Sequence, residues 1–295
     1  MTEPDGQHIE GYDAGIREQL IAEAADLVRA FGFTAHHIVL IGGMVPGILV
    51  PALDPGIEPH VGTADIDLCL SLALVVGDTE SYERMETTLK RLGFTQGDAS
   101  FRWHRRDGVK LTVEFFCPAG ENRPAGRAFR PNTTSSPTAK HNMGGHLSAL
   151  ALNAGELLTA DFEVIERTVE LPQRKGTLDV QLRVTGPLAF LVAKVEALNK
   201  RDKPKDAYDI VWLIESWPGG PSEAAAAFAQ RPAFARDEVH VALQAIGRAF
   251  KTTDSIGPRS YARFLAHTAD EEARLERNAV AAVAEFLRHL PARSQ

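Results

Sequence analysis

The 295-residue sequence lacks three features that mark particular classes of protein. Its two cysteines, Cys69 and Cys117, each sit in an apolar run, so they cannot build a disulfide framework and are expected to be reduced core residues. No run approaches the roughly 20 apolar residues of a membrane span, and the start of the chain is acidic and polar rather than signal-like. An excess of positive charge is also missing. The net charge of −7 argues against a protein that coats nucleic acid with its whole surface, although it leaves room for a local basic groove. These absences predict a soluble cytoplasmic protein with no membrane contact.

The composition itself is that of an ordinary globular protein, with 44% hydrophobic and 24% charged residues. Apolar spacing predicts helices over 15–31 and 79–92, and strands over 37–41, 65–74, 101–106, 109–116, 147–152, 162–171 and 178–184. The Asp107-Gly108 pair predicts a hairpin turn, and residues 119–145 predict a long surface loop. Helices follow over 187–199, 206–216 and the Ala-rich remainder. We therefore predict an α/β (α+β) domain over residues 1–185 and a mostly helical domain over residues 186–295.

The most informative stretch is an acidic pair. Asp65 and Asp67 are two apart on a predicted strand, so both side chains project from the same face. Two carboxylates side by side repel each other, and the pKa of each rises unless a cation lies between them. Mg²⁺, or Mn²⁺ in its place, suits such hard oxygen ligands and commonly binds one or two carboxylates together with substrate phosphates. The pair predicts a metal site, and the alternative is a solvated strand edge.

A glycine pair and a lone acid accompany these aspartates. Gly42 and Gly43 follow a predicted buried strand, and a turn without side chains can bring backbone N–H groups to the phosphates of a nucleotide. Metal-assisted attack on a phosphate needs both parts. Glu114, alone in an apolar strand, is the candidate for a third carboxylate, either as metal ligand or as general base. Its facing depends on strand register, because a slip of one residue would turn it away.

A second cluster lies in the predicted helical domain. Lys194 occupies an apolar helical position, which is costly unless the side chain reaches water or meets an anion. A basic run and then two acids follow it: Lys200, Arg201, Lys203, Lys205, Asp206 and Asp209. The plain alternatives are a solvated linker for the lysines and a helix N-cap for Asp206.

A locally basic region lies between residues 102 and 140, with eight Lys or Arg against three acids, a net charge of +5. Such a patch would favour RNA phosphates, and Phe101, Trp103 and Phe129 could stack on unpaired bases. The alternative is a basic surface loop with core aromatics. His141 and His146 are five apart in a Gly-rich stretch, a spacing that is more often incidental than metal-binding. The residues predicted to bind RNA are Arg102, Arg105, Arg123, Arg127, Arg130, Lys200 and Arg201.

The order of these motifs resembles the AbiEii-type nucleotidyltransferases. The motifs are GG, then T-x-D-I-D-L, an acid-bearing strand, K-x-x-A-L-x-x-R and K-D-x-x-D, and they run from about Val39 to Leu213. That family includes toxins of type IV toxin–antitoxin systems and the MenT enzymes of mycobacteria. A basic residue often precedes the Gly-Thr pair in the family, where this chain has His60-Val61.

The resemblance implies a DNA polymerase β-like nucleotidyltransferase fold with a mixed sheet and a helical C-terminal domain. It also implies that Asp65 and Asp67 bind metal and that Lys194 contacts the triphosphate. Asp206 or Asp209 would complete the site. The nucleotide-binding residues expected on this basis are Gly42, Gly43, Thr63, Lys194, Asp206 and Asp209.

The sequence thus predicts an enzyme that uses Mg²⁺ to transfer a nucleotide from ATP or another NTP to an acceptor. MenT-like enzymes modify the 3′ end of tRNA, so the expected acceptor is tRNA and the expected role is that of a toxin with a separate antitoxin protein. Two alternatives stay open at this point. One is a small-molecule, antibiotic-modifying nucleotidyltransferase, and the other is a nucleotide-binding regulator without catalysis.

Overall fold

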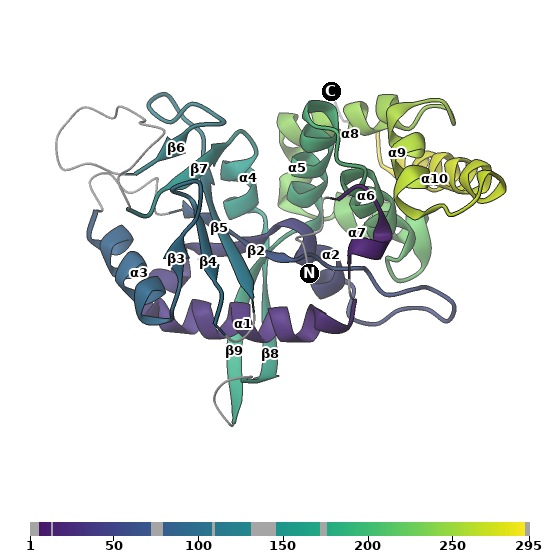
Figure 1. Ribbon diagram of the computed structural model, residues 1–295. Helices are drawn as coiled ribbons and strands as arrows, with labels where there is room; N and C mark the ends of the chain where they lie inside the picture. Colours follow the sequence, from purple (N-terminus) through teal and green to yellow (C-terminus); the bar gives the residue numbers. More distant parts are fainter. Residues whose placement is uncertain are drawn as a thin grey trace. The chain divides into compact units, whose positions relative to one another are not determined.

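A computed structural model describes residues 6–12, 14–71, 79–107, 110–130, 146–171 and 176–292 (Figure 1). The chain forms two compact units. The sheet unit comprises Gly15–Val45 and Thr63–Gly186, and the helical unit comprises Met1–Ala14, Pro46–Gly62 and Pro187–Gln295. The boundary after Gly186 falls one residue from the predicted one. Residues 1–14 and 46–62, which the sequence analysis placed in the first domain, belong instead to the helical unit.

The sheet unit is built on a mixed sheet, which has nine strands within the described residues. The strands are β1 (Ile38–Ile41), β2 (Asp65–Leu70), β3 (Thr95–Gln96), β4 (Arg102–Arg105), β5 (Leu111–Pro118), β6 (Ala128–Phe129), β7 (Ala149–Leu152), β8 (Phe162–Glu170) and β9 (Thr177–Thr185). Their main order is β3-β4-β5-β2-β1-β9-β8, and β7 pairs with β5 and β6. The β2–β5, β1–β9 and β5–β7 pairs are parallel and the others antiparallel. The predicted mixed α/β class is confirmed.

Helices pack on the sheet so that one face is closed and the other is covered in part. The helices of this unit are α1 (Arg17–Ala30), α3 (Thr79–Arg91) and α4 (Gly155–Ala160). Phe31, at the end of α1, meets Phe115 of β5 edge-on at 6.2 Å between ring centroids. On the opposite face, the Cys69 thiol lies 3.9 Å from the carbonyl oxygen of Gly155 at the start of α4. Because Cys69 is two residues beyond Asp67 on β2, α4 covers the same face that carries the aspartates, but further along the strand.

The helical unit holds six further α-helices among its described residues, besides α2 (Val45–Leu49), which spans the boundary. They are α5 (Pro187–Lys200), α6 (Lys205–Glu215), α7 (Gly220–Ala229), α8 (Asp237–Ala249), α9 (Ile256–Leu265) and α10 (Ala269–His289). The longest, α10, has Thr268 as its N-cap, and the hydroxyl of Thr268 accepts a hydrogen bond from the N–H of Glu271. None of the described helices combines the length and the apolar character needed to cross a membrane.

Three predicted elements differ in detail. Strand β2 ends at Leu70 rather than at residue 74, and residues 72–78 lie outside the described part of the chain. The predicted surface loop 119–145 contains β6, because Ala128 and Phe129 are buried and pair with β7. Gly108, Lys140 and His141 lie outside the described residues, so the proposed hairpin turn and the His pair are not described in full.

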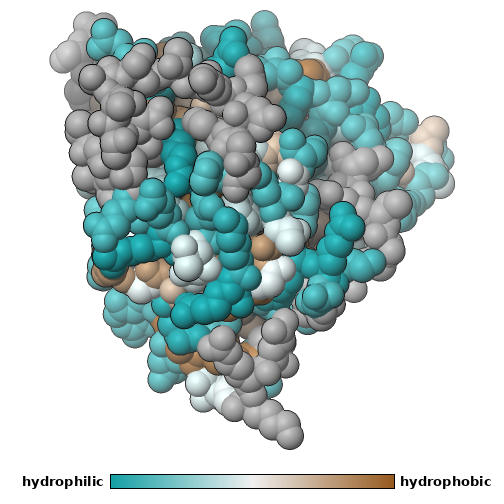
Figure 2. Space-filling model, turned by 60° about the vertical axis from the view of Figure 1, so that its left-hand side comes forward, coloured by the Kyte–Doolittle hydropathy of each residue, from teal (hydrophilic) through white to brown (hydrophobic). Residues whose placement is uncertain are grey.

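The surface seen in Figure 2 is mainly hydrophilic, and apolar residues form small separate spots on it. Among the described residues, the large apolar side chains with the greatest exposure are Phe33, Val164, Val241 and Ile256. Singly scattered apolar residues of this kind are normal on soluble proteins.

One basic residue that was expected on the surface is buried. Arg105, at the end of β4, is 7% exposed, and its guanidinium lies 2.8 Å from the carboxylate of Glu23 in α1. The guanidinium also stacks 5.2 Å above the ring of Phe94. Arg105 therefore ties α1 to the sheet and does not offer its charge to RNA, which corrects the prediction made from the sequence.

We expect Arg105→Ala to destabilise the protein by about 3–5 kcal/mol, because it leaves the Glu23 carboxylate buried without its partner. The matched control is Arg106→Ala, since Arg106 is the next residue and is exposed. Urea unfolding followed by circular dichroism measures both. Equal effects of the two substitutions would contradict a structural role for Arg105.

A second buried carboxylate joins α3 to the segment that precedes β7. Glu86 accepts hydrogen bonds from Lys90, from Arg130 at 3.0 Å and from the backbone N–H of Leu147 at 3.0 Å. Burial alone would raise its pKa, but these hydrogen bonds and charges outweigh burial and lower the pKa to about 2. Arg130, another residue predicted to bind RNA, is thus engaged within the unit.

A depressed carboxyl pKa stabilises the folded state above the unfolded pKa and loses that effect as the pH falls toward the folded value. Glu86→Gln should therefore lower the free energy of unfolding near pH 7, and the difference from the wild type should shrink as the pH falls from about 4.5 toward about 2. Urea titrations at a series of pH values measure the difference. A difference that stays constant down to about pH 3 would show that the charge of Glu86 is not responsible.

Candidate active site

Strand register brings the predicted acids to one face of the sheet. In the parallel pair of β2 and β5, Asp65 lies opposite Thr112, and Asp67 lies opposite Glu114. Partners in register project from the same face, and the intervening Ile66 and Val113 are fully buried on the other. Glu114 is therefore beside the aspartate pair, as its selection from the sequence required.

Gly42 makes room for one of these acids. Ile41 at the end of β1 pairs with Asp67, and Gly42 then turns the chain with a φ of +75°. A Cβ atom on Gly42 would lie 1.8 Å from the Oδ2 atom of Asp67. Only glycine permits both this backbone conformation and this approach. The glycine pair, with Gly43 buried in the same short turn, therefore positions Asp67 directly.

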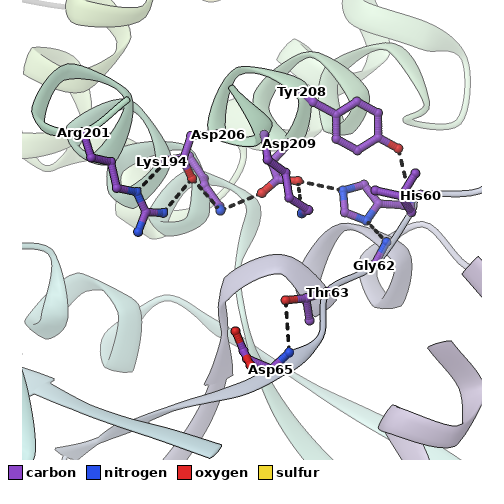
Figure 3. Close-up of polar contacts among 11 residues, drawn as sticks. His60, Gly62, Thr63, Asp65, Lys194, Arg201, Asp206, Tyr208 and Asp209 are labelled. Carbon is purple, nitrogen blue, oxygen red and sulfur yellow. Dashed lines mark hydrogen bonds and ion pairs between the residues drawn. The ribbon is translucent and has the colours of Figure 1, made fainter. Parts of the chain in front are cut away.

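The chain enters β2 through a local hydrogen bond. The hydroxyl of Thr63 accepts a hydrogen bond of 3.3 Å from the backbone N–H of Asp65 (Figure 3). A threonine two residues before a backbone donor is a common way to fix the start of an element. Thr63, predicted to bind nucleotide, thus also sets the backbone that presents Asp65.

The third acid is already engaged. The Nε of Arg102 lies 2.5 Å from a carboxylate oxygen of Glu114, and the same guanidinium contacts Asp98 at 3.2 Å. Within the described ranges, no three Asp, Glu, His or Cys side chains converge as a group that could hold a metal ion. The two aspartates suit Mg²⁺ by the chemistry of their hard oxygens. Glu114 is near them, but its carboxylate is bound by Arg102.

In the helical unit, Lys194 of α5 meets two carboxylates of α6. Its Nζ lies 3.0 Å from Asp206 and 2.6 Å from Asp209 (Figure 3). Arg201 binds Asp206 through two nitrogens at 2.7 and 2.9 Å, and Lys205 binds Asp209 at 2.6 Å. Asp206 is not the N-cap of α6, since Pro204 holds that position. The largely enclosed amine of Lys194 thus meets its anions inside the protein.

The charges in this cluster are strongly stabilised. Burial favours the neutral amine of Lys194, but the carboxylates of Asp209 and Asp206 outweigh it and raise its pKa. Burial likewise opposes ionisation of the two acids, and the cations around them nevertheless lower the pKa of Asp206 and, further, that of Asp209. Lys205 differs, because burial lowers its pKa despite Asp209. Lys194 therefore carries a proton and both acids are ionised at neutral pH.

A comparison of the chain with known protein families shows to which family the protein belongs. Residues 26–292 match the family described as "Nucleotidyl transferase AbiEii toxin, Type IV TA system". The chain belongs to the AbiEii family. It is accordingly a nucleotidyltransferase toxin of a type IV toxin–antitoxin system, as the motif order indicated.

Two solved structures are similar to this AbiEii protein at low sequence identity. An antigenic nucleotidyltransferase-like protein from Paracoccidioides brasiliensis is 14% identical, with 80% of this chain and 89% of that chain covered and a TM-score of 0.38. MenT4, a nucleotidyltransferase toxin from Mycobacterium tuberculosis H37Rv, is 15% identical, with 97% and 89% covered and a TM-score of 0.37. Neither score is high enough to support an argument about the site, so membership rests on the family match. No curated protein matches the chain.

The structure of the AbiEii protein places its predicted RNA-binding residues in different environments. Arg123 donates to the carbonyl oxygen of Pro118 and stacks on Phe129, and Lys200 pairs with Glu196. Arg127 is exposed. Trp103 and Phe129 are buried and cannot offer stacking faces to bases, which corrects the expectation for these two residues, whereas Phe101 is half-buried. Arg102, Arg105, Arg130 and Arg201 make the ion pairs described above.

The part played by His60 was not apparent from the sequence. The side chain is fully buried, and its imidazole lies 3.0 Å from Asp209, the residue that binds Lys194. Burial lowers the pKa of His60 to about 4 although the hydrogen bond to Asp209 opposes this, so the ring is neutral at pH 7. The only available signal was its position just before Gly62-Thr63.

Gly42→Ala should abolish most of the transferase activity of this AbiEii toxin, because the new methyl group displaces the Asp67 carboxylate by an ångström or more, which can cost about 100-fold in rate. Gly56→Ala is the matched control. Gly56 also has a positive φ, +90°, but a Cβ atom there meets nothing within 4 Å. Both variants carry the backbone strain, and only Gly42→Ala should lose activity in a nucleotide-incorporation assay. Equal losses would mean that strain, and not the contact with Asp67, is decisive.

Proposed function

We propose that the protein transfers a nucleoside monophosphate from an NTP to the 3′ end of tRNA in a reaction that depends on Mg²⁺. The observation that carries the proposal is the placement of Asp65 and Asp67 on one face of β2, beside the Gly42 turn and in register with Glu114. Membership of the AbiEii family supports the reaction class. The tRNA acceptor is proposed from the resemblance to MenT-like enzymes.

In this reaction an acceptor hydroxyl attacks the α-phosphate in line. A bond forms between the hydroxyl oxygen and the α-phosphorus, the bond to the bridging oxygen breaks, and pyrophosphate leaves. Asp65 and Asp67 would hold the metal ion, Mg²⁺ or Mn²⁺, which would neutralise charge at the phosphate oxygens. Lys194 contacts the triphosphate, with Asp206 and Asp209 fixing its amine.

The hydroxyl proton needs an acceptor, and Glu114 is the nearest candidate on the strand next to the aspartates. Its ion pair with Arg102 orients its carboxylate, and acceptance of the proton requires Arg102 to release it. Exposed basic residues near the same strands, Arg106, Lys110 and Arg127, supply positive charge for an RNA phosphate backbone. A separate antitoxin protein would counteract the toxin.

The test incubates purified protein with Mg²⁺, each α-³²P-labelled NTP in turn and total tRNA. We expect label on tRNA, and loss of that label with EDTA. Asp67→Asn should lower the rate roughly 1000-fold or more, because a metal ligand stabilises the transition state by several kcal/mol. Glu170→Gln, which removes an exposed charge at the end of β8, is the control and should keep full activity.

Labelled tRNA that persists in Asp67→Asn would contradict the role of the aspartate pair. Label on no RNA, with transfer to a small molecule instead, would overturn the tRNA acceptor and leave the transferase class intact. NTP binding without any transfer would overturn the catalytic proposal.

A further inference from the structure

Helix α6 holds the segment that leads into β2 through several consecutive contacts. The indole Nε1 of Trp212 donates to the carbonyl oxygen of Glu58 at 3.0 Å, and the backbone N–H of Val61 donates to the hydroxyl of Tyr208 at 3.1 Å. The ring of His60 stacks on Tyr208 at 5.0 Å and meets Trp212 edge-on at 4.9 Å. All of these residues belong to the helical unit. The segment is therefore packed on α6 before the chain continues to Asp65.

The hydrogen bonds of His60 define which ring nitrogen carries the proton. The backbone N–H of Gly62 donates to Nδ1 at 3.0 Å, so Nδ1 must be unprotonated. Nε2 then carries the hydrogen and donates it to Asp209 at 3.0 Å (Figure 3). A neutral imidazole with this tautomer satisfies both partners at once.

These two hydrogen bonds connect the charged cluster around Asp209 to the backbone of Gly62. One carboxylate oxygen of Asp209 accepts hydrogen bonds from His60 and Lys205, and the other forms an ion pair with Lys194. Gly62, on the other side of the imidazole, is three residues before Asp65 in the chain and adopts a φ of +74°. A continuous path of two hydrogen bonds and an ion pair thus runs from the Gly62 amide through His60 and Asp209 to the amine of Lys194.

We propose that His60 is a positioning residue of the transferase, which ties the backbone before Asp65 to the carboxylate that orients Lys194. The inference rests on the proposed function. His60 is fully buried and does not touch substrate. A residue that only filled space between Tyr208 and Trp212 would need the ring alone, whereas this role needs both ring nitrogens.

Three substitutions separate the two roles. His60→Phe keeps an aromatic ring and loses both hydrogen bonds. His60→Asn keeps an oxygen near the position of Nδ1, and His60→Gln keeps an N–H near that of Nε2. Trp212→Phe is the control, because it removes the bond to Glu58 from the same segment and leaves the path through His60 intact.

The first measurement is kinetic. We expect kcat to fall about 10- to 100-fold in His60→Phe, which is the range for a small misplacement of reacting groups or of the residues that orient them. His60→Asn and His60→Gln should each recover part of the loss, and Trp212→Phe should stay within about twofold of the wild type. If His60 acts through Asp209, the double variant His60→Phe, Asp209→Asn should be no slower than Asp209→Asn alone. Full additivity of the two losses would overturn the inference.

The second measurement is amide hydrogen exchange, which needs no substrate. The Gly62 amide should exchange at least about tenfold faster in His60→Phe than in the wild type, and His60→Asn should restore protection. Circular dichroism checks that each variant is folded, and the Asn and Gln variants carry the test if the Phe variant unfolds.

The outcomes for the two proposals differ. A wild-type protein that transfers nucleotide to no acceptor overturns the proposed function, and with it the positioning role. An active wild type together with undiminished kcat or unchanged Gly62 exchange in His60→Phe overturns the role of His60 alone.

Discussion

The packing of the helical unit around α6 depends on how the buried charge of Asp209 is compensated. A fully buried charge costs several kcal/mol unless cations and hydrogen bonds compensate it. Here two lysines and a neutral imidazole do so, and they come from α5, from the first turn of α6 and from the segment before β2. The two neighbouring helices and a segment about 150 residues before them therefore converge on one side chain. The same convergence fixes the amine of Lys194, the group that we propose to contact the triphosphate.

In the sheet unit the acids of β2 stay partly exposed at the edge of a buried core. Strand β2 has its aspartates at the start, where both side chains are partly exposed, and Cys69 further along, where α4 covers it. The opposite face is filled by Ile66, Val113 and Phe115. One short strand thus combines a closed core face with an open acidic end, and the Gly42 turn beside it leaves space that a side chain would occupy.

The sequence predicted features that depend on the alternation of side chains along one strand. It did not predict features that depend on contacts between residues far apart in the chain. The two-residue spacing of Asp65 and Asp67 was enough to place them together, since alternation along a strand is a local property. The facing of Glu114 depended on register between strands, which spacing alone leaves open. Its engagement by Arg102 could not be foreseen either, because an ion pair across strands depends on the register of both.

The basic residues show the same limit. Arg105 and Arg106 are adjacent and chemically identical, yet one is buried against Glu23 and the other is exposed. The sequence between residues 102 and 140 therefore predicted the local net charge, but it did not show which of the charged side chains are exposed. The contact of His60 with Asp209 could not be recognised from the sequence for a related reason. Its importance comes from Asp209, which is 149 residues away in the chain, and no spacing rule connects them.

The division of the chain into units bears on how this protein can be cut or recombined. The backbone passes between the units after Ala14, Val45, Gly62 and Gly186, so the helical unit is assembled from three separate stretches. A gene fragment that begins at Pro187 would encode α6 without the residues that pack against Tyr208 and Trp212. Such a fragment would present a bare aromatic surface and an incompletely compensated Asp209. The helical unit is therefore not a portable module that one continuous stretch of the chain could encode.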